Sequence, residues 1–315
     1  MDRVLVTGGC GFIGSHIVEQ LLDSGCRVVV LDDLSTGFEA NIPVNNPNLT
    51  LIRGCITDRE TVLAATKGID AVIHLAAVVS VQASIEKPDE THRVNMGGTL
   101  TVLNAARICG VKRFLFASSA AVYGNVGKEA IGETICPRPQ TPYGFDKLAG
   151  EQYVAFYGQK CAMSVASLRL FNVYGPRQDP TSDYAGVISK FVESACTNRR
   201  TIIFGDGRQS RDFVYVGDIA RVFVDVLRQS DIRNQSINVG TGSARTLLDV
   251  LSALEQLTGV EFQTMHAAER PGDIRYSQAD ITHLRTALGY SPATDLVTGL
   301  SSLIESRKGL KTVSI

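Results

Sequence analysis

The sequence predicts an α/β protein, built on a doubly wound parallel sheet with a smaller C-terminal lobe. Short β-branched runs alternate with amphipathic helical segments through the first half of the chain, which is the pattern of a parallel sheet covered by helices. The chain opens with a strand, a glycine-rich turn and a helix within residues 3–24. After residue 175 the alternation loosens into loops, short strands and helices, which indicates an added lobe.

Periodicity and turn residues place the elements of the first half in order. Asp58 directly precedes a helical segment and is expected to cap it, because a carboxylate accepts hydrogen bonds from the first free N–H groups. Residues 34–47, rich in asparagine and proline, are expected to form a loop. Strands are expected near residues 3–7, 27–31, 49–53, 70–74, 112–117 and 164–169, and helices near residues 12–24, 59–66, 85–109 and 143–159.

The turn after the first strand carries three glycines at a spacing of three residues. Gly8 permits a sharp turn, Gly11 leaves room for a pyrophosphate, and Gly14 lets the following helix pack closely on the strand. The helix N-terminus then offers free N–H groups to phosphates. Asp32 ends the second strand, where an acid accepts a ribose hydroxyl of NAD and repels the extra phosphate of NADP. Strand, helix and acid together favour NAD over a glycine-rich turn without a ligand.

The cofactor half therefore comes first in the chain. We expect an NAD-binding Rossmann-type domain over residues 1–175 and a substrate lobe over residues 176–315. Asp212–Tyr215 and Ile237–Val239 have the composition of strands, and we expect them to rejoin the first sheet.

Composition and charge exclude several classes of partner. With 31 basic and 32 acidic residues and no basic run, no nucleic-acid or membrane surface is expected. The longest mainly apolar stretch, Ala71–Val79, is too short to span a bilayer, and the N-terminus does not resemble a signal peptide. Seven scattered cysteines without a Cys-x-x-Cys pair indicate free thiols in a reducing cytoplasm. The five histidines lack metal-ligand spacing, so no metal site is predicted.

A second group of polar residues follows the strand expected at 112–117. Ser118 and Ser119 lie at its carboxyl end, where ligands of such sheets bind. Tyr143 and Lys147 are four residues apart and share a helix face. The lysine cation is expected to lower the tyrosine pKa from about 10 towards neutrality, which suits a general base. The alternative is an ordinary surface pair, but the serines and the glycine turn in the same chain favour catalysis.

These residues belong to a longer series of motifs, which resembles the extended short-chain dehydrogenase/reductase family and, within it, the UDP-sugar 4-epimerases. The resemblance extends from Val4 to about Ala287. Its motifs are Thr7-Gly8-x-x-Gly11-x-x-Gly14, Asp32-Asp33-Leu34-Ser35-Thr36-Gly37, His74-Leu75-Ala76-Ala77, Asn95-x-x-Gly98-Thr99, Ser118-Ser119-Ala120-Ala121-Val122-Tyr123-Gly124, Pro142-Tyr143-Gly144-x-x-Lys147, Arg169-x-Phe171-Asn172-Val173-Tyr174-Gly175-Pro176-Arg177, Arg211-Asp212-Phe213-Val214-x-Val216-x-Asp218 and Arg270-Pro271-Gly272-Asp273.

The resemblance implies roles for the catalytic and cofactor residues. Tyr143 would be the acid/base, Lys147 would hold the nicotinamide ribose and tune Tyr143, and Ser119 would bind the sugar O4. His74 is expected to be a hydrogen-bonded core residue rather than a ligand. The implied NAD site comprises Gly8, Gly11, Phe12, Ile13, Gly14, Asp32, Asp33, Ser35, Thr36, Gly37, Ile56, Leu75, Ala76, Ala77, Asn95, Ser118, Tyr143 and Lys147.

One position departs from the family pattern. Cys55 stands where relatives usually carry an aspartate that accepts the adenine amino group, and cysteine is a weak acceptor. Asp58 is already expected to cap a helix and is not assigned as a replacement.

The implied substrate is a UDP-sugar. Its phosphates would contact Asn172, Arg211 and Arg270, and its nucleotide ribose would contact Asp273, although each arginine is also suited to a solvated or structural ion pair. Ser119 and Ser277 would face the hexose. Val187, Phe191 and Phe204 would line the uracil site, or equally form the core of the lobe.

The same resemblance narrows the reaction. Dehydratases and decarboxylases carry an acid beside the catalytic serine, where this chain has Ala120 and Ala121, so a 4-epimerase is favoured over those two classes, and a uronate epimerase stays as the alternative enzyme. The small Ser277 leaves room for an N-acetyl group on the hexose. A non-catalytic NAD-binding regulator is a further alternative. The segments 89–109 and 143–159 imply a homodimer by resemblance, whereas periodicity equally allows packing within one chain.

Overall fold

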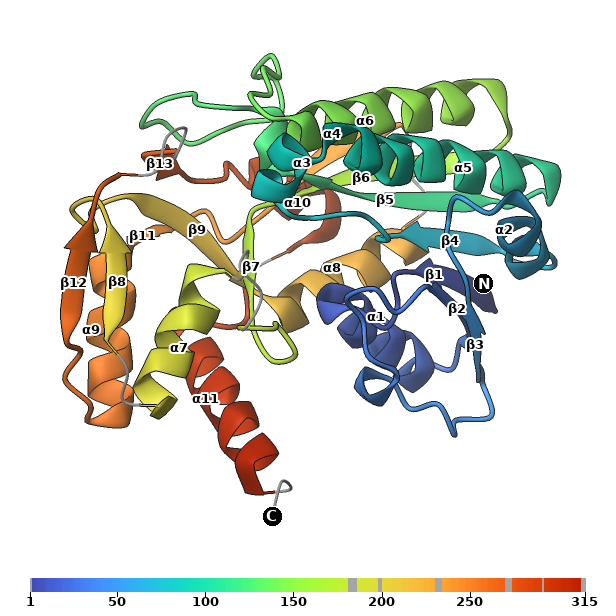
Figure 1. Ribbon diagram of the computed structural model, residues 1–315. Helices are drawn as coiled ribbons and strands as arrows, with labels where there is room; N and C mark the ends of the chain where they lie inside the picture. The colour runs from blue at the N-terminus through green and yellow to red at the C-terminus, as the bar shows by residue number, and fades with distance from the viewer. Residues whose placement is uncertain are drawn as a thin grey trace.

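Seven parallel strands form the central sheet. A computed structural model describes residues 2–180, 186–197, 200–229, 234–269, 274–290 and 292–312. The sheet order is β10-β6-β5-β4-β1-β2-β3, so the winding reverses between β1 and β4 and the predicted doubly wound sheet is confirmed (Figure 1). The strands are β1 (Arg3–Thr7), β2 (Arg27–Asp32), β3 (Leu49–Arg53), β4 (Ala71–His74), β5 (Arg113–Ser119), β6 (Ser164–Leu170) and β10 (Gln235–Val239).

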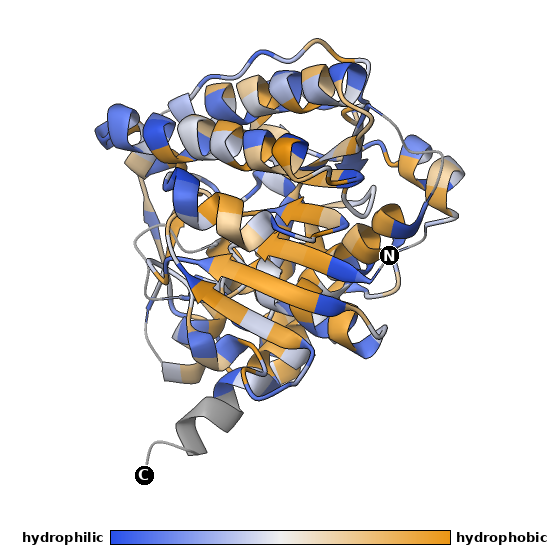
Figure 2. Cartoon of the chain, turned by 90° about the vertical axis from the view of Figure 1, so that its right-hand side faces the viewer, coloured by the Kyte–Doolittle hydropathy of each residue, from blue (hydrophilic) through white to orange (hydrophobic). Residues whose placement is uncertain are grey.

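Helices cover both faces of this sheet. In β1, Val4 and Val6 belong to one buried apolar cluster, and Leu5 belongs to the other. Successive side chains of a strand point to opposite faces, so both faces are buried, and Figure 2 shows the central strands in the colour of apolar residues. One face is covered by α1 (Phe12–Asp23) and α8 (Val216–Arg228), and the other by α2 (Arg59–Thr66), α5 (Thr99–Ile108) and α6 (Pro142–Lys160) (Figure 1).

Two local predictions have different outcomes. Asp58 caps α2 as predicted, with its carboxylate accepting hydrogen bonds from the N–H groups of Glu60 and Thr61. The helix expected over residues 85–109 is present with a later start: the helical backbone is continuous from Pro88 to Ile108 and includes a π-helical segment. Pro88 starts a new helix because its ring cannot continue the preceding one. The segment contains α3 (Val81–Glu86), α4 (Pro88–His92), a π-helical segment (Arg93–Gly98) and α5.

The C-terminal lobe has two small sheets and its own apolar core. The four-stranded sheet comprises β7 (Asn172–Tyr174), β9 (Ser210–Tyr215), β11 (Ala244–Thr246) and β13 (Tyr276–Ser277), and the other sheet comprises β8 (Thr201–Phe204) and β12 (Thr264–Ala267). The core includes Phe191, Leu251 and Leu300. These residues come from the lobe helices α7 (Val187–Thr197), α9 (Leu247–Thr258) and α11 (Leu296–Thr312), while α10 (Thr282–Leu288) packs beside β10.

The chain returns from the lobe to the first sheet through only one of the two segments expected to do so. Ile237–Val239 lies in β10 and pairs with β6. The expectation for Asp212–Tyr215 is wrong, because this segment lies in β9 and pairs with β7, β11 and β13. The reason is Asp212, whose buried carboxylate accepts hydrogen bonds from Thr241, Gly242 and Ala279. An apolar layer of the first sheet would leave that carboxylate unsatisfied.

Candidate active site

The glycine turn brings the N-terminus of α1 to the carboxyl end of β1. Gly8 has a φ of +71°, and a Cβ there would lie 2.8 Å from the Ala76 nitrogen. A Cβ on Gly14 would lie 2.1 Å from the Gly8 carbonyl oxygen, so only glycine allows this close packing. Among the described residues, no side chain caps α1 at Gly11, and its first turn has no acid. The free N–H groups and the positive end of the helix dipole fit a pyrophosphate.

Asp32 is fixed beside this turn at the end of β2. Its buried carboxylate accepts hydrogen bonds from the N–H groups of Cys10 (2.9 Å) and Leu34 (2.8 Å). Burial raises the pKa of Asp32, and a ribose hydroxyl would supply a further donor to the charged form. The Phe38 N–H donates to the Cys10 carbonyl, and a Cβ on Gly37 would lie 2.8 Å from Cys10, so the loop after β2 packs against the turn.

The remaining NAD residues predicted after β2 and β3 occupy the neighbouring loops. The Asp33 carboxylate accepts hydrogen bonds from both the N–H and the hydroxyl of Ser35, and Thr36 is exposed beside them. Ile56 is buried against the π-helical segment, where a Cβ on Gly98 would lie 2.4 Å from its side chain. Cys55 lies 3.1 Å from the Thr57 hydroxyl. Asp58 caps α2. The adenine-binding carboxylate that the resemblance implies is therefore assigned neither to Cys55 nor to Asp58.

A buried relay centred on His74 holds the loop after β4. Its Nδ1 lies 2.7 Å from the Thr7 hydroxyl and its Nε2 lies 3.0 Å from the Thr99 hydroxyl. The Thr99 hydroxyl donates to the Asn95 carbonyl oxygen (2.5 Å), so it must accept from Nε2–H, and Nδ1 accepts from Thr7. The Thr7 hydroxyl in turn accepts from the Ala76 N–H. The prediction that His74 is a hydrogen-bonded core residue is confirmed.

Asn95 also holds the loop after β4, through two hydrogen bonds to the backbone of Val78. Its amide oxygen accepts from the Val78 N–H (2.7 Å), and its amide nitrogen donates to the Val78 carbonyl oxygen (3.0 Å). Asn95 is buried in the π-helical segment, and π-bulges are frequent at functional sites. The side chain predicted to bind the cofactor therefore positions the segment Leu75–Ala77 at the sheet edge.

The His74 relay predicts a pH-dependent stability. Burial, with a smaller effect of the Lys147 charge, lowers the pKa of His74 to about 3. The unfolded chain, with a histidine pKa near 6.5, then binds more protons than the folded chain at intermediate pH. The stability from His74 is complete above pH 6.5 and is lost as the pH falls towards 3, by about 1.4 kcal/mol per unit.

Denaturant unfolding at a series of pH values measures this contribution. His74→Leu is expected to lower the unfolding free energy by about 1–3 kcal/mol at pH 7, because it removes the imidazole hydrogen bonds of two buried hydroxyls, Thr7 and Thr99. The difference in unfolding free energy between the wild type and His74→Leu should become smaller as the pH falls below 6.5. The exposed control His266→Gln should keep the wild-type slope, and equal slopes for all three proteins would contradict the relay.

Ser119, Tyr143 and Lys147 come together at the carboxyl end of β5. Tyr143 and Lys147 lie one turn apart on α6 and are 8% and 5% exposed. The Lys147 Nζ donates to the Ala117 carbonyl oxygen (2.7 Å) and lies 5.8 Å from the centre of the Tyr143 ring. The Ser119 and Tyr143 hydroxyls are hydrogen bonded. The arrangement can hold a substrate hydroxyl beside a phenol and a buried cation.

The expected lowering of the Tyr143 pKa is wrong for the protein alone. Burial raises this pKa to about 12, and the hydrogen bond with Ser119 opposes the rise only in part. The same burial lowers the pKa of Lys147 to about 8. Spacing along a helix brings the two groups together, but desolvation penalises both charged forms. A phenolate at neutral pH therefore needs positive charge beyond that of Lys147.

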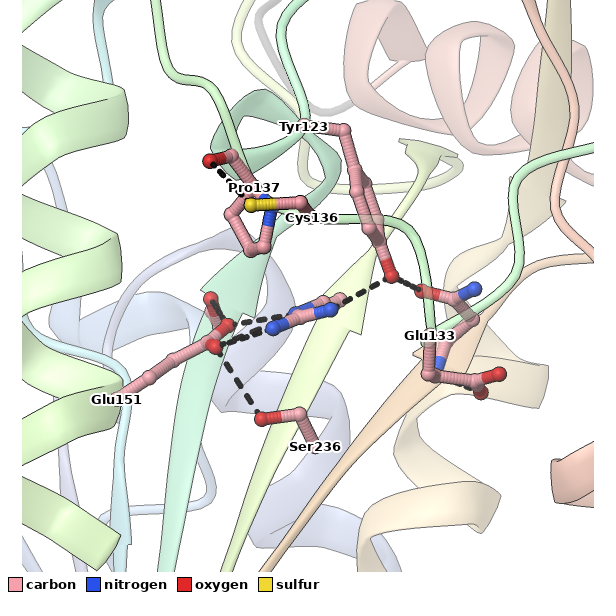
Figure 3. A network of polar contacts seen from close by, with 9 residues as sticks. Tyr123, Glu133, Cys136, Pro137, Glu151 and Ser236 are labelled. Carbon is pink, nitrogen blue, oxygen red and sulfur yellow. Dashed lines mark hydrogen bonds and ion pairs between the residues drawn. The ribbon is translucent and has the colours of Figure 1, made fainter. Parts of the chain in front are cut away.

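Sequence reasoning missed a buried ion pair behind these residues. Glu151 binds Arg169 through Oε2–Nη2 (2.7 Å) and Oε1–Nε (2.9 Å), and it accepts the Ser118 hydroxyl hydrogen bond (2.5 Å) (Figure 3). Ser118, predicted to belong to the NAD site, therefore donates its hydroxyl hydrogen within the protein. The sequence did signal the place of Glu151, which follows Lys147 by four residues as Lys147 follows Tyr143, but it did not signal the pairing with Arg169.

Strand β9 brings several predicted substrate residues together. Ser277 lies opposite Arg211, and Asn172 lies opposite Phe213, two residues further along β9. Arg270 and Asp273 lie outside the described residues.

The three candidates for the uracil site lie on other elements of the lobe. Val187 begins α7 and packs against the lobe core, and Phe204 ends β8 half-buried. Phe191 is buried within the core itself.

Two kinds of feature are absent from the described residues. No helix there combines the length and apolar character needed to cross a membrane. Nor do three or more His, Cys, Asp or Glu side chains in the described part of the chain gather into a group suited to a metal ion.

Comparison with known proteins gives the family. The model of the NAD dependent epimerase/dehydratase family matches residues 4–240. A putative UDP-glucose 4-epimerase of Methanocaldococcus jannaschii is 36% identical over 307 residues, covering 97% of this chain and 98% of that protein.

Two solved structures are also similar. A UDP-N-acetylglucosamine 4-epimerase from Methanobrevibacter ruminantium M1, in complex with UDP-N-acetylmuramic acid, has a TM-score of 0.94 at 34% identity, covering 98% of this chain and 99% of that chain. The Thermus thermophilus UDP-glucose 4-epimerase, in complex with NAD, has a TM-score of 0.90 at 39% identity with the same coverage. The chain belongs to the NAD dependent epimerase/dehydratase family.

Proposed function

We propose that the protein interconverts UDP-hexoses that differ at C4, namely UDP-glucose with UDP-galactose and UDP-N-acetylglucosamine with UDP-N-acetylgalactosamine. The observation that carries this proposal is the meeting of Ser119, Tyr143 and Lys147 at the sheet edge that also bears the glycine turn. The names of the similar proteins support the same reaction.

NAD would lie along the carboxyl ends of β1, β2, β4 and β5. The N-terminus of α1 would hold its pyrophosphate, Asp32 its adenosine ribose, and Lys147 its nicotinamide ribose. The loop Leu75–Ala77, fixed by Asn95, would border it. Bound in its oxidised form, NAD supplies a hydride acceptor for C4 of the sugar and a positive charge near Tyr143.

Tyr143 would take the proton of the sugar O4 and later return it. Ser119, hydrogen bonded to Tyr143, would hold O4 in line with the phenol. The Lys147 ammonium would favour the phenolate against the burial that raises the pKa of Tyr143, and the positive charge of an oxidised cofactor would add to it. The phenol then works as a general base near neutral pH.

Epimerisation also requires the 4-keto sugar to turn while its nucleotide stays bound. Asn172, Arg211 and Arg270 would hold the diphosphate, Asp273 the nucleotide ribose, and Val187 and Phe204 the uracil. Strong contacts remote from the hexose retain the intermediate without fixing the sugar ring. Arg211 and Ser277 lie opposite each other on β9 and β13. They would mark the boundary between the tightly held diphosphate and the loosely held hexose of the substrate.

A product assay tests this function. The protein, with no added NAD, is incubated separately with UDP-glucose, UDP-galactose and their two N-acetylated counterparts, and products are identified by chromatography and NMR. C4 epimers are expected from all four. Ala120 and Ala121 form a short 3-10 turn after Ser119, where an acid would serve dehydration. A keto or pentose product would indicate another sugar-modifying reaction, and absence of turnover would indicate a non-catalytic NAD-binding protein.

Pocket size gives a specificity prediction at Ser277. This side chain is buried in β13 opposite Arg211, so a larger residue would fill space beside the proposed substrate path. Ser277→Tyr is expected to abolish turnover of the N-acetylated pair while UDP-galactose turnover changes less than about tenfold. The control Ser277→Ala should retain turnover of both the N-acetylated and the non-acetylated pair of substrates. Equal loss on the two pairs of substrates would contradict the assignment.

We further infer a homodimer formed through α5 and α6. Phe145 and Phe156 on α6 are 58% and 52% exposed, and Tyr153 and Ile108 add to this apolar surface. Phe156→Glu is expected to convert a dimer into a monomer in sedimentation at micromolar concentration, because a buried unpaired carboxylate is costly. The control Ile202→Glu, at an exposed apolar position in the lobe, should stay dimeric. A monomeric wild-type protein would contradict the inference.

The cysteines support a location for this enzyme. None of the seven, all of which lie within the described residues, forms a disulfide. Free thiols persist in reducing compartments, so we propose the cytoplasm.

A further inference from the structure

The first turn of α6, which carries the proposed acid/base, is held by partners outside the helix. The first N–H groups of a helix have no acceptor within it. Pro142 begins α6 and has no N–H of its own. The Gly144 N–H donates to the Thr141 hydroxyl, which caps the helix (3.2 Å). The Tyr143 N–H donates to the Ser84 hydroxyl (3.2 Å), so the backbone of Tyr143 is bound to a side chain of another element.

Ser84 lies in α3, in a fixed and fully buried place. Its hydroxyl hydrogen is donated to the Val81 carbonyl oxygen (2.6 Å), which leaves its lone pairs for the Tyr143 N–H. The helix α3 lies against α6 (Figure 1) and is capped by Ser80. It follows the loop Leu75–Ala77, which would border NAD. Ser84 therefore links the loop beside the proposed cofactor site to the backbone of the proposed acid/base.

Gly144 brings the same turn of α6 close to the 3-10 turn after β5. A Cβ on Gly144 would lie 2.8 Å from the Ala121 carbonyl oxygen, which is a backbone atom of that turn. The Ala121 N–H donates to the Ser119 hydroxyl oxygen (3.2 Å). Because Gly144 contacts the turn that holds Ser119, the separation between α6 and this turn sets the distance between the Ser119 and Tyr143 hydroxyls.

We propose that Ser84 is a positioning residue for the epimerase reaction: by holding the Tyr143 backbone, and together with the close contact at Gly144, it keeps the phenol beside Ser119 and the sugar O4. This inference rests on the proposed function. A general base must lie within hydrogen-bonding reach of the proton that it takes. A misplacement of about 1 Å can lower a rate by about 100-fold, so Tyr143 acts only if the first turn of α6 is placed accurately.

The test measures kcat and KM for UDP-galactose with NAD in excess, so that loss of cofactor does not contribute. Ser84→Ala removes the acceptor of the Tyr143 N–H and should lower kcat by at least about tenfold. Gly144→Ala forces α6 away from the Ala121 carbonyl oxygen and should lower kcat by about 100-fold. In both variants KM should stay within about twofold of the wild type, because the residues proposed to hold the nucleotide lie in the lobe.

Two control variants leave the contacts of Tyr143 in place. Thr141→Ala removes the cap of the same helix but keeps the hydrogen bond between Tyr143 and Ser84. Gly158→Ala adds a methyl group near the other end of α6, where its Cβ would lie 2.0 Å from the Asn234 side-chain oxygen. Both should lower the thermal midpoint, while kcat should stay within about twofold of the wild type.

A double variant separates a role through the phenol from a general structural effect. Tyr143→Phe keeps the backbone N–H and removes the hydroxyl, so adding Ser84→Ala to it should not lower kcat again. A general structural effect would multiply the two losses.

The outcomes that would overturn the proposal are distinct from those that bear on the reaction itself. Wild-type turnover in a folded Ser84→Ala or Gly144→Ala variant, an equal loss of kcat in Thr141→Ala, or multiplied losses in the double variant would overturn it. If Gly144→Ala does not fold, Ser84→Ala and the double variant decide. An inactive wild-type protein would instead count against the proposed function.

Discussion

Tyr143→Phe is expected to lower kcat for UDP-galactose by about 100- to 10,000-fold, the usual contribution of a general acid or base. The phenol is the only group we assign to move the O4 proton, and its ring is buried. Phenylalanine keeps the ring and removes the hydroxyl, whose hydrogen-bond partner is Ser119. KM should change little, because the residues proposed to hold the diphosphate lie in the lobe. Steady-state kinetics measures both constants.

A matched variant separates this chemical role from packing. Tyr157→Phe removes a phenol from the same helix, where it donates to Asn104 near the surface (2.7 Å). Its kcat should stay within about twofold of the wild type, as expected of a surface substitution. Tyr143→Phe with more than a tenth of wild-type turnover would exclude Tyr143 as the acid/base.

Gly14→Ala should have the largest effect on stability. The added Cβ would lie 2.1 Å from the Gly8 carbonyl oxygen and 2.8 Å from the Gly9 Cα, both backbone atoms in the turn that packs α1 on the sheet. Backbone cannot move aside as a side-chain tip can, so we expect a loss of at least about 3 kcal/mol, or failure to fold. Denaturant unfolding followed by circular dichroism measures the loss.

Gly11→Ala is the contrasting variant in the same turn. Its Cβ would lie 3.3 Å from its nearest neighbour, the Gly8 carbonyl oxygen, and Gly11 has ordinary extended angles. Stability should stay within about 1 kcal/mol of the wild type. The methyl group would instead occupy the proposed pyrophosphate space, and NAD binding by calorimetry should weaken by about tenfold or more. If Gly14→Ala and Gly11→Ala lost stability equally and NAD affinity equally, Gly14 would not be specific to packing nor Gly11 to pyrophosphate binding.

The sequence predicted the local structural features well, because each depends on residues that are close together in the chain. The glycine turn, the Asp58 cap and the positions of the first six strands along the chain follow from spacing and residue type. The helix expected over residues 85–109 begins at Pro88 instead of residue 85, and this proline was visible in the chain. The strand at Asp212 was assigned correctly but placed in the wrong sheet, because its partners, such as Thr241 and Ala279, lie far away in sequence.

The electrostatics of the site could not be read from spacing. The spacing of four residues from Tyr143 to Lys147 indicates a shared helix face, but the pKa of each depends on burial by β5 and α6 together. Arg169 appeared only as part of a motif, since nothing in the chain shows that it pairs with Glu151. The roles of Arg270 and Asp273 stay predictions from the family resemblance.

The most direct test of the central claim follows the hydrogen at C4. The protein, without added NAD, is given UDP-galactose carrying deuterium at C4 in ordinary water, and the UDP-glucose formed is examined by NMR and mass spectrometry. If the C4–H bond is broken and remade within one closed site, the product keeps its deuterium at C4. UDP-glucose with hydrogen from water at C4 would contradict the account.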